Sequence, residues 1–306
     1  MPDVSLRVAT IDDMPGVSRI LRTLFPAWVM SDDAWRHNFR TFPARARRRI
    51  VVAEAGGEIV GFASAFLDFE ATQESTGRMR LMVLPESRRQ GIGSALYDDA
   101  LAHEAEIGAR SVYLWAPDDD DAHRFAVKRG WEQRRTMRYS MADLTDTSLL
   151  PPMPDTPKGV RLVDLDEAGP RAVFEFDRIV SQDEPTDVPG EMHSYDEWMA
   201  MHWLSPDHRP DLGVVAMSGG KVIAGTIVDV DEPYRRSVSG FTGVVREHRG
   251  RGLAKLVKSA SLRKVAAAGI THAYTSNDEE NAPMIAVNAW LGYRFMTNQR
   301  QYRKIL

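Results

Sequence analysis

Residues 82–96, which read MVLPESRRQGIGSAL, decide the fold because the chain contains this stretch twice. The second copy, residues 243–256, reads GVVREHRGRGLAKL. Both copies follow the pattern Val-x-x-x-x-Arg-x-x-Gly-x-Gly/Ala. An apolar strand end, a glycine-containing turn and a helix-periodic run follow one another in each. The pattern predicts a strand, a turn and a helix in that order, in two places.

A glycine turn that opens a helix is suited to bind a pyrophosphate. Small residues let the backbone approach the ligand closely, and the first N–H groups of a helix have no intrahelical partner. These donors lie at the positive end of the helix dipole, where an anion is also attracted. The plainer interpretation is a strand-to-helix turn without a ligand. Two copies in matching surroundings favour the anion site.

Two better-known phosphate loops do not fit the first copy. Residues 91–96 lack the third glycine of a dinucleotide fingerprint, and no Gly-Lys-Ser/Thr follows as a P-loop requires. Both stretches instead resemble motif A of the GNAT superfamily of N-acetyltransferases, whose turn holds the pyrophosphate of acetyl-CoA. The resemblance covers nearly all of both halves and implies acetyl-CoA as the acetyl donor.

The resemblance also implies which residues bind the donor. In the family, the strand before the turn bonds pantetheine through its backbone, and the turn holds the pyrophosphate. The corresponding residues of the first copy are Val83, Arg88, Arg89, Gln90, Gly91, Ile92, Gly93 and Ser94. Those of the second copy are Val244, Val245, Arg249, Gly250, Arg251, Gly252, Leu253 and Ala254. Asn281 matches a family asparagine that contacts pantetheine.

Other landmarks recur at nearly the same spacing, which indicates one fold repeated. The hairpin sequence of residues 52–61 matches residues 215–224, and Gly130-Trp131 matches Gly292-Tyr293. With 306 residues, each half is long enough to bury a core of its own. We predict an amino-terminal domain at 1–146, a proline-rich linker at 147–158 and a carboxy-terminal domain at 159–306.

Periodicity gives the same order of elements in both halves. The fold class predicted is α/β (α+β), with two tandem GNAT folds, each a mixed and mostly antiparallel sheet with helices on both faces. Strands are expected at 6–8, 49–55, 58–69, 78–84, 111–115 and 137–142, and helices at 12–24, 31–42, 91–107 and 120–129. In the second half, strands are expected at 160–162, 212–217, 221–229, 236–245, 273–276, 293–297 and 302–305, and helices at 168–180, 194–204, 253–268 and 282–291.

Composition excludes several chemistries. The chain has no cysteine, so it forms no disulfide, no thiolate metal site and no acetyl-cysteine intermediate, and no metal site is predicted. With a net charge of -4, the sequence lacks the overall positive charge that nucleic-acid binding favours, and no nucleic-acid partner is predicted. The amino terminus lacks a signal peptide and no apolar run has membrane-spanning length, so we expect a cytoplasmic protein without a membrane partner.

Acetyl transfer to an amine needs a base for the amine and, in many family members, an acid for the leaving sulfur. The tyrosine that serves as this acid in the family is replaced by Ala126 in the first half and Asn288 in the second. Asn288 retains a hydrogen-bond donor, so the carboxy-terminal half is the better equipped. As general base of that half we consider Asp229, Asp231 and Glu232, with Asp68 and Glu70 as first-half counterparts. Carboxylates at strand ends otherwise only face water.

The second half holds about nine extra residues before its hairpin. They lie near residues 181–193, in the loop that borders the acceptor pocket of this fold. Asp183, Glu184, Asp187 and His193 are candidate substrate-binding residues, because their carboxylates would attract a cationic amine. A solvated acidic loop is the equally weighted alternative.

Together the sequence predicts direct acetyl transfer from acetyl-CoA to a primary amine of a small molecule, with the carboxy-terminal half catalytic. The tandem layout resembles that of mycothiol synthase-like actinobacterial acetyltransferases. A catalytically degenerate acyl-CoA-binding sensor or scaffold is the alternative, and an aminoacyl transferase is disfavoured by the acidic balance. The acceptor, and the choice between monomer and homodimer, stay open.

Overall fold

The computed structural model describes residues 4–73, 75–190 and 194–306. The first half follows the predicted order of elements. Its strands are β1 (Val4–Val8), β2 (Arg49–Ala55), β3 (Glu58–Leu67), β4 (Thr76–Val83), β5 (Ser111–Pro117) and β6 (Glu132–Asp143). Its helices are α1 (Met14–Leu24), α2 (Asp32–Thr41), α3 (Ile92–Glu106) and α4 (Asp120–Lys128).

The second half repeats this order. Its strands are β7 (Arg161–Asp164), β8 (Val214–Ser218), β9 (Lys221–Asp231), β10 (Arg236–Val244), β11 (His272–Asp278) and β12 (Arg294–Ile305). Its helices are α5 (Leu165–Ala168), α6 (Pro170–Val180), α7 (Tyr195–Trp198), α8 (Leu253–Ala267) and α9 (Ala282–Trp290). The prediction of two closing strands at 293–297 and 302–305 was wrong, because β12 runs unbroken through both and absorbs the irregularities as shifts of register against β6.

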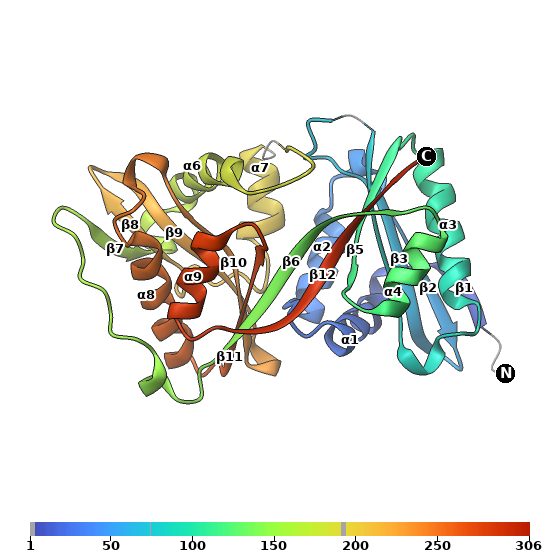
Figure 1. The fold of residues 1–306 in the computed structure, drawn as a ribbon, viewed down its shortest axis with the longest axis horizontal. Helices are drawn as coiled ribbons and strands as arrows, with labels where there is room; N and C mark the ends of the chain where they lie inside the picture. The colour runs from blue at the N-terminus through green and yellow to red at the C-terminus, as the bar shows by residue number, and fades with distance from the viewer. Residues whose placement is uncertain (1–3, 74, 191–193) are drawn as a thin grey trace.

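All twelve strands of the described residues form one sheet, in which the halves exchange their last strands. The order is β1-β2-β3-β4-β5-β12-β6-β11-β10-β9-β8-β7. β12, from the second half, pairs with β5 of the first half, and β6 pairs with β11 of the second. Figure 1 shows these two long strands side by side, spanning the middle of the molecule. The halves are therefore joined by pairing as well as by the linker.

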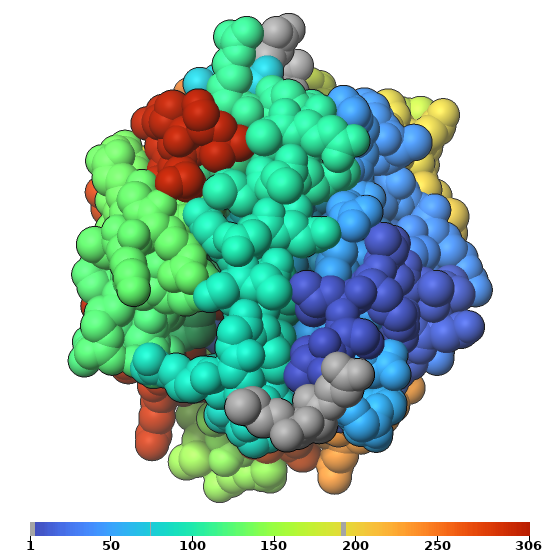
Figure 2. All heavy atoms as spheres, turned by 90° about the vertical axis from the view of Figure 1, so that its right-hand side faces the viewer, coloured from blue at the N-terminus to red at the C-terminus, as the bar shows by residue number. Residues whose placement is uncertain are grey.

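The carboxy-terminal strand contributes to the core of the first half. Tyr302 on β12 is fully buried in the same cluster as Val112, Leu96 and Trp131. In Figure 2 the last residues of the chain, in red, reach the surface among the green and teal atoms of the first half. A cut after residue 146 would remove this strand from the first sheet, and the predicted division at 1–146, 147–158 and 159–306 stays a prediction.

The two faces of the sheet carry different layers. Along β4, Met79 and Val83 belong to the core beneath α3, whereas Met82 belongs to the core beneath α1 and α2. Alternation along a strand explains the separation, since successive side chains point to opposite faces. The described helices include none that is both long enough and apolar enough to cross a membrane.

In each half two neighbouring parallel strands pair only at their beginnings. β4 and β5 are in register from Thr76 opposite Ser111 to Met79 opposite Leu114, and no further. β10 and β11 pair from Arg236 to Val238. Beyond these positions the strands separate, and each half has a V-shaped opening in the sheet at the ends of β4 and β10. The last paired position of each is called its apex below.

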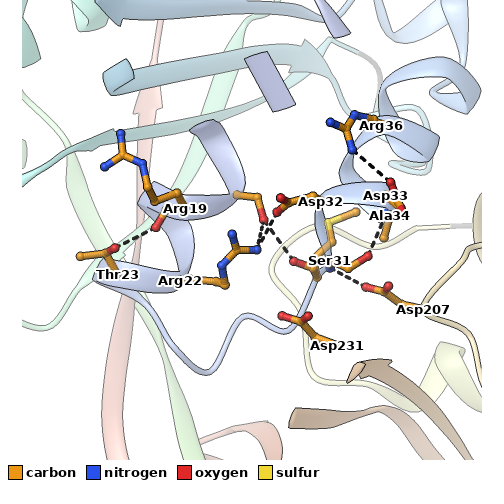
Figure 3. Close-up of polar contacts among 12 residues, drawn as sticks. Arg19, Arg22, Thr23, Ser31, Asp32, Asp33, Ala34, Arg36, Asp207 and Asp231 are labelled. Atoms are coloured by element: carbon orange, nitrogen blue, oxygen red, sulfur yellow. Dashed lines mark hydrogen bonds and ion pairs between the residues drawn. The ribbon is translucent and has the colours of Figure 1, made fainter. Parts of the chain in front are cut away.

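The halves also meet through a polar contact beside α2. Asp207 accepts a hydrogen bond from the backbone N–H of Ser31 at 2.6 Å, and the Ser31 hydroxyl caps α2 by accepting from Ala34 N–H. Figure 3 shows Asp207 and Asp231 of the second half approaching the start of α2. This contact ties the loop before β8 in the second half to the start of α2 in the first half.

Candidate functional site

The two predicted turns have the same backbone geometry. The residues at positions 89 and 91 have φ of 63° and 85°, and those at positions 250 and 252 both have φ of 74°. Left-handed residues at alternate positions turn successive N–H groups toward one side, which makes a concave anion site. Arg89 holds this conformation without being glycine, which is uncommon for a long side chain. Both turns therefore have the backbone of an anion-binding nest at a helix N-terminus.

One arginine closes each turn from inside. Nε of Arg88 donates to the carbonyl oxygen of Val83 at 3.0 Å, and Nε of Arg249 donates to that of Val244 at 3.1 Å. The same atom pair in both halves shows that this arginine braces the turn. A contact of its remaining N–H groups with a cofactor stays a prediction.

The strand before each turn presents backbone groups to the opening. Leu84 N–H donates to Val60 on β3, and Val245 N–H donates to Ile223 on β9. Because successive residues of a strand direct their backbone groups to opposite edges, Val83 and Val244 direct theirs away from these neighbours and into the opening. This orientation fits the predicted hydrogen bonds to pantetheine.

A cavity of about 620 Å³ runs along the first opening. It extends from the turn, between α3 and α4, to Leu24 and Phe25 on the other side of the sheet. Six of the first-half residues predicted to bind the cofactor line it: Val83, Arg88, Arg89, Gly91, Gly93 and Ser94. The other two do not: Ile92 is buried in the core, and Gln90 is exposed and donates to Glu86 O.

Polar groups border the mouth of this cavity. Arg129 donates to the hydroxyl of Ser94 at 2.9 Å and stacks on the ring of Phe125 at 3.6 Å. Arg89 is paired with Asp121, whose pKa is lowered by hydrogen bonds from Arg124 and Arg89. The mouth therefore keeps cations beside the nest, as a pyrophosphate requires.

The predicted cofactor residues of the second turn divide in the same way. Leu253 is buried in the core, like Ile92. Arg251 contacts Nδ1 of His248 at 2.9 Å, which holds both side chains at the surface of the turn. Val245 and Ala254 are partly buried beside Gly250 and Gly252. No atom of the described residues lies within 4 Å of the space above either glycine.

The asparagines of the second half form two separate contacts. Asn288 is buried and donates to the side-chain oxygen of Asn277 at 2.5 Å, while its own Oδ1 is buried without a partner among the described residues. Asn281 accepts from Met284 N–H at 3.3 Å and caps α9. Asn281 therefore has the plainer role that helix-start asparagines often have, and its cofactor contact stays a prediction.

The three carboxylates considered as bases have different surroundings. Asp231 is buried and paired with Arg236 at 2.6 Å, and Arg236 also donates to Pro26 O of the first half. Glu232 is paired with Arg209 at 2.5 Å near the surface. Both carboxylates are therefore engaged by an arginine.

Asp229 is the third, and it lies at the apex of the second opening. Its Oδ1 is 3.4 Å from Nδ1 of His208, and its Oδ2 lies 3.3 Å from the space above Gly240, where β10 bulges away from β9. His208 is buried against Trp203, and its Nε2 has no partner among the described residues. Sequence reasoning missed His208, because its isolated bridge to Asp229 joins a loop to a strand and leaves no periodic signal.

The acidic loop is held by arginines. Asp183 pairs with Arg246 and with Arg249 of the second turn, and hydrogen bonding to Arg246 lowers the pKa of Asp183. Asp187 pairs with Arg134 and Arg135 on β6, at 2.9 and 3.3 Å.

Glu184 differs from the two aspartates. Burial by the surrounding chain, with Asp177 and Glu70 nearby, raises its pKa to about 7 although its side chain still reaches solvent. The fourth predicted substrate residue, His193, lies outside the described residues. The attraction of an amine to this loop stays a prediction. Of the three predicted carboxylates, Asp183 and Asp187 pair with arginines, and no arginine of the described chain pairs with Glu184.

Comparison with known proteins agrees with this geometry. Residues 14–131 match the Acetyltransferase (GNAT) family. A mycothiol acetyltransferase of Catenulispora acidiphila is 27% identical over 269 residues, covering 85% of this chain and 79% of its own. One of Nocardioides sp. is 27% identical over 250 residues, covering 74% and 80%. A solved tandem GNAT protein from the clavulanic acid biosynthesis pathway superposes with a TM-score of 0.76 at 21% identity, covering 99% of this chain and 98% of its own.

Proposed function

Because this chain is an N-acetyltransferase of the GNAT superfamily with the tandem arrangement, we propose that it transfers the acetyl group of acetyl-CoA directly to a primary amine of a small molecule. We further propose that the chemistry belongs to the carboxy-terminal half. The observation that carries this choice is the Asp229–His208 pair at the apex of the second opening. A charge-relay pair of this kind has no counterpart at the first apex, where Arg80 follows the last paired residue of β4 within the described chain.

The residues of both turns fit the donor. The nests at 89–91 and 250–252 offer backbone N–H groups to a pyrophosphate, and Val83 and Val244 offer backbone groups to pantetheine. Acetyl-CoA supplies an acetyl group activated as a thioester. The chain has no cysteine, so direct attack by the amine is the route that needs no acylated thiol of the protein.

The amine must lose a proton before it attacks. An alkyl ammonium with a pKa near 10.4 costs roughly 4 to 5 kcal/mol to deprotonate at neutral pH. His208 is suited to accept this proton on Nε2, since its Nδ1 faces the carboxylate of Asp229 and a carboxylate stabilises an imidazolium. In this proposal Asp229 is a positioning residue and His208 is the base.

The division of labour is tested with matched turn variants. Gly252→Asp is expected to reduce acetyl transfer by about 100-fold or more, because the carboxylate repels the pyrophosphate and covers its donors. Gly91→Asp is expected to leave transfer within about threefold of wild type, since it changes only the half without the proposed base. Gly219→Asp in the β8–β9 hairpin has similar backbone strain and open space above it, so it serves as the control.

Transfer is measured as thiol release with a panel of polyamines, aminoglycosides and amino sugars. Asp229→Asn and His208→Gln are expected to lower kcat with little change in the KM for acetyl-CoA. Loss of transfer in Gly91→Asp with full activity in Gly252→Asp would reverse the assignment of the two halves.

The competing function is a catalytically degenerate acyl-CoA-binding sensor or scaffold. Ala126 stands where the family has its acid, and it lies on the wall of the first cavity, so this half offers binding without an acid. A sensor binds acetyl-CoA in a calorimeter yet releases no thiol with any amine of the panel. An enzyme turns over at least one of them.

A further inference from the structure

Arg80 lies one residue beyond the apex of the first opening. It is the first residue of β4 beyond Met79, the last one paired with β5. Alternation along the strand directs its side chain to the face of Met82, toward α1 and the loop that follows it. Its guanidinium lies over the ring of Trp28, 4.0 Å from the ring centroid. The cation therefore faces the acceptor side of the sheet, at the point where the strands separate.

No acceptor atom within residues 4–73, 75–190 and 194–306 contacts this guanidinium. Two other arginines near the openings have carboxylate partners. Arg78, two residues earlier on the same face, pairs with Asp68 at 2.6 Å, and Arg135 pairs with Asp278 at 2.8 Å. Like any arginine, Arg80 has five N–H donors. It differs from Arg78 and Arg135 because the contact given for its guanidinium is the ring of Trp28 and not a carboxylate.

The surroundings of Arg80 favour an added anion. Burial lowers the pKa of Arg80 to about 10, and Arg48, itself without a carboxylate partner in the described chain, adds a second positive charge nearby. Arginine stays protonated at neutral pH. A desolvated cation that lacks a counter-ion is costly, and an anion that forms a bidentate pair with it removes that cost.

The first cavity is lined by the residues on either side of Arg80 in the sequence, and Arg80 itself lies behind this lining. Met79, Leu81 and Met82, which flank Arg80 on β4, line the cavity together with Leu24 and Phe25. The ring of Phe25 meets that of Tyr139 edge to face at 4.6 Å. A ligand that extends along the cavity from the turn therefore reaches the apolar side chains that flank Arg80 on β4 and the ring of Phe25.

We propose that Arg80 forms a carboxylate-binding subsite at the apex of the first opening. The carboxylate belongs either to the acyl chain of a dicarboxylic acyl-CoA, such as succinyl-CoA, or to a small carboxylated amine that enters from the acceptor side. Binding of a dicarboxylic acyl-CoA depends on the proposed function, because it requires that the first half binds a CoA ester. Binding of a carboxylated amine does not depend on it. In the repeat, Phe241 corresponds to Arg80, so the subsite belongs to the first half.

The test is calorimetric titration of the full chain in the Gly252→Asp background, which isolates the first half. Acetyl-CoA is compared with succinyl-CoA, and each of several amino acids is compared with its amide. Each titration is repeated with Arg80→Met, which keeps an unbranched side chain without the charge, with Arg80→Lys, which keeps the charge, and with Arg36→Met, at a partly exposed arginine of α2, as the control. Thermal melting of every variant reports whether it folds, and Arg80→Gln replaces Arg80→Met if that variant does not.

The expected result is a preference of 10- to 100-fold for one carboxylated ligand over its neutral match, as for a hydrogen bond to a charged group. Arg80→Met abolishes the preference, Arg80→Lys restores part of it and Arg36→Met leaves it unchanged. A preference for succinyl-CoA identifies the acyl source, and a preference for amino acids identifies the amine source. Equal affinities for all matched pairs in the Gly252→Asp protein with Arg80 intact, or a preference that survives in Arg80→Met, would overturn the subsite. A failure of the proposed function gives a different result from a failure of the subsite. If the first half does not bind CoA esters, neither acetyl-CoA nor succinyl-CoA binds, but the amino-acid titrations still test Arg80.

Discussion

The hydroxyl of Tyr302 lies 2.9 Å from Nδ1 of His123, although Tyr302 belongs to the last strand of the chain and His123 to α4 of the first half. Tyr302 is fully buried in the first-half core. The contact marks where the exchanged strand β12 completes a sheet that the first half cannot complete with its own residues.

Tyr302→Ala is expected to lower the free energy of unfolding by about 3 to 5 kcal/mol, because it removes a large buried ring and leaves a cavity. Tyr302→Phe removes only the hydroxyl contact with His123 and is expected to cost about 1 kcal/mol. Urea unfolding measures both values. Leu149→Ala, at a site 74% exposed, serves as the control. Equal stability of Tyr302→Ala and the control would contradict the contribution of β12 to this core.

Separating the halves is expected to leave open sheet edges. Residues 1–146 alone keep β5 without β12, and β6 without either of its partners. Unpaired edges favour association, so this fragment is expected to aggregate or to exchange strands with a second copy. Coexpression with residues 147–306 is expected to restore a 1:1 complex, measured by light scattering after chromatography. A stable monomer of the first fragment would show that β6 can fold back beside β5.

The buried carboxyl group of Glu104 is expected to make the folded protein less stable at alkaline pH. Its side chain is completely buried, it accepts from Phe66 N–H, and burial raises its pKa to about 8. The pKa of Glu104 is higher in the folded chain than in the unfolded chain. Its contribution to the free energy of unfolding is therefore full below about pH 4.5 and is lost as the pH rises through about 8. Glu104→Gln is expected to remove up to about 5 kcal/mol of this pH dependence. Urea midpoints at pH 5, 7 and 9 measure the difference between the two proteins, and parallel curves would contradict the assignment.

Asp207 predicts a second, weaker pH effect at the contact between the halves. Burial, opposed by the hydrogen bonds from Ser31, raises its pKa to about 6. The protonated carboxyl is favoured in the folded chain, so its contribution is lost as the pH rises through about 6. Asp207→Asn keeps an acceptor for Ser31 N–H and is expected to be more stable than wild type at pH 8 by about 1 to 3 kcal/mol. Asp207→Leu, which removes the acceptor, is expected to be less stable at both pH 5 and pH 8.

The repeat allowed most of the fold to be predicted. Alternation and helical spacing are local properties, so strands such as β2 and helices such as α3 were found within a few residues of their ends. The exchange of β6 and β12 could not be predicted. A strand has the same periodicity whether it pairs within its own half or with the other, and the partner is decided by the path of the whole chain.

The candidate site shows the same limit. The turn residues Gly91 and Gly252 were identified because positive φ and close approach constrain the residue type itself. His208 and Arg80 were missed, since their significance depends on Asp229 in one case and on the separation of β4 from β5 in the other. Neither relationship is visible in spacing along the sequence.

The exchange of β6 and β12 also delays completion of the first half during translation. When β5 leaves the ribosome, its neighbour β12 has not been translated, and about 180 residues separate the two. At about 5 to 20 residues per second, the nascent first half waits on the order of 10 to 40 s with that edge uncovered. A chaperone that shields exposed strand edges during this interval would therefore raise the yield of the whole protein, and pausing codons after residue 146 would lower it.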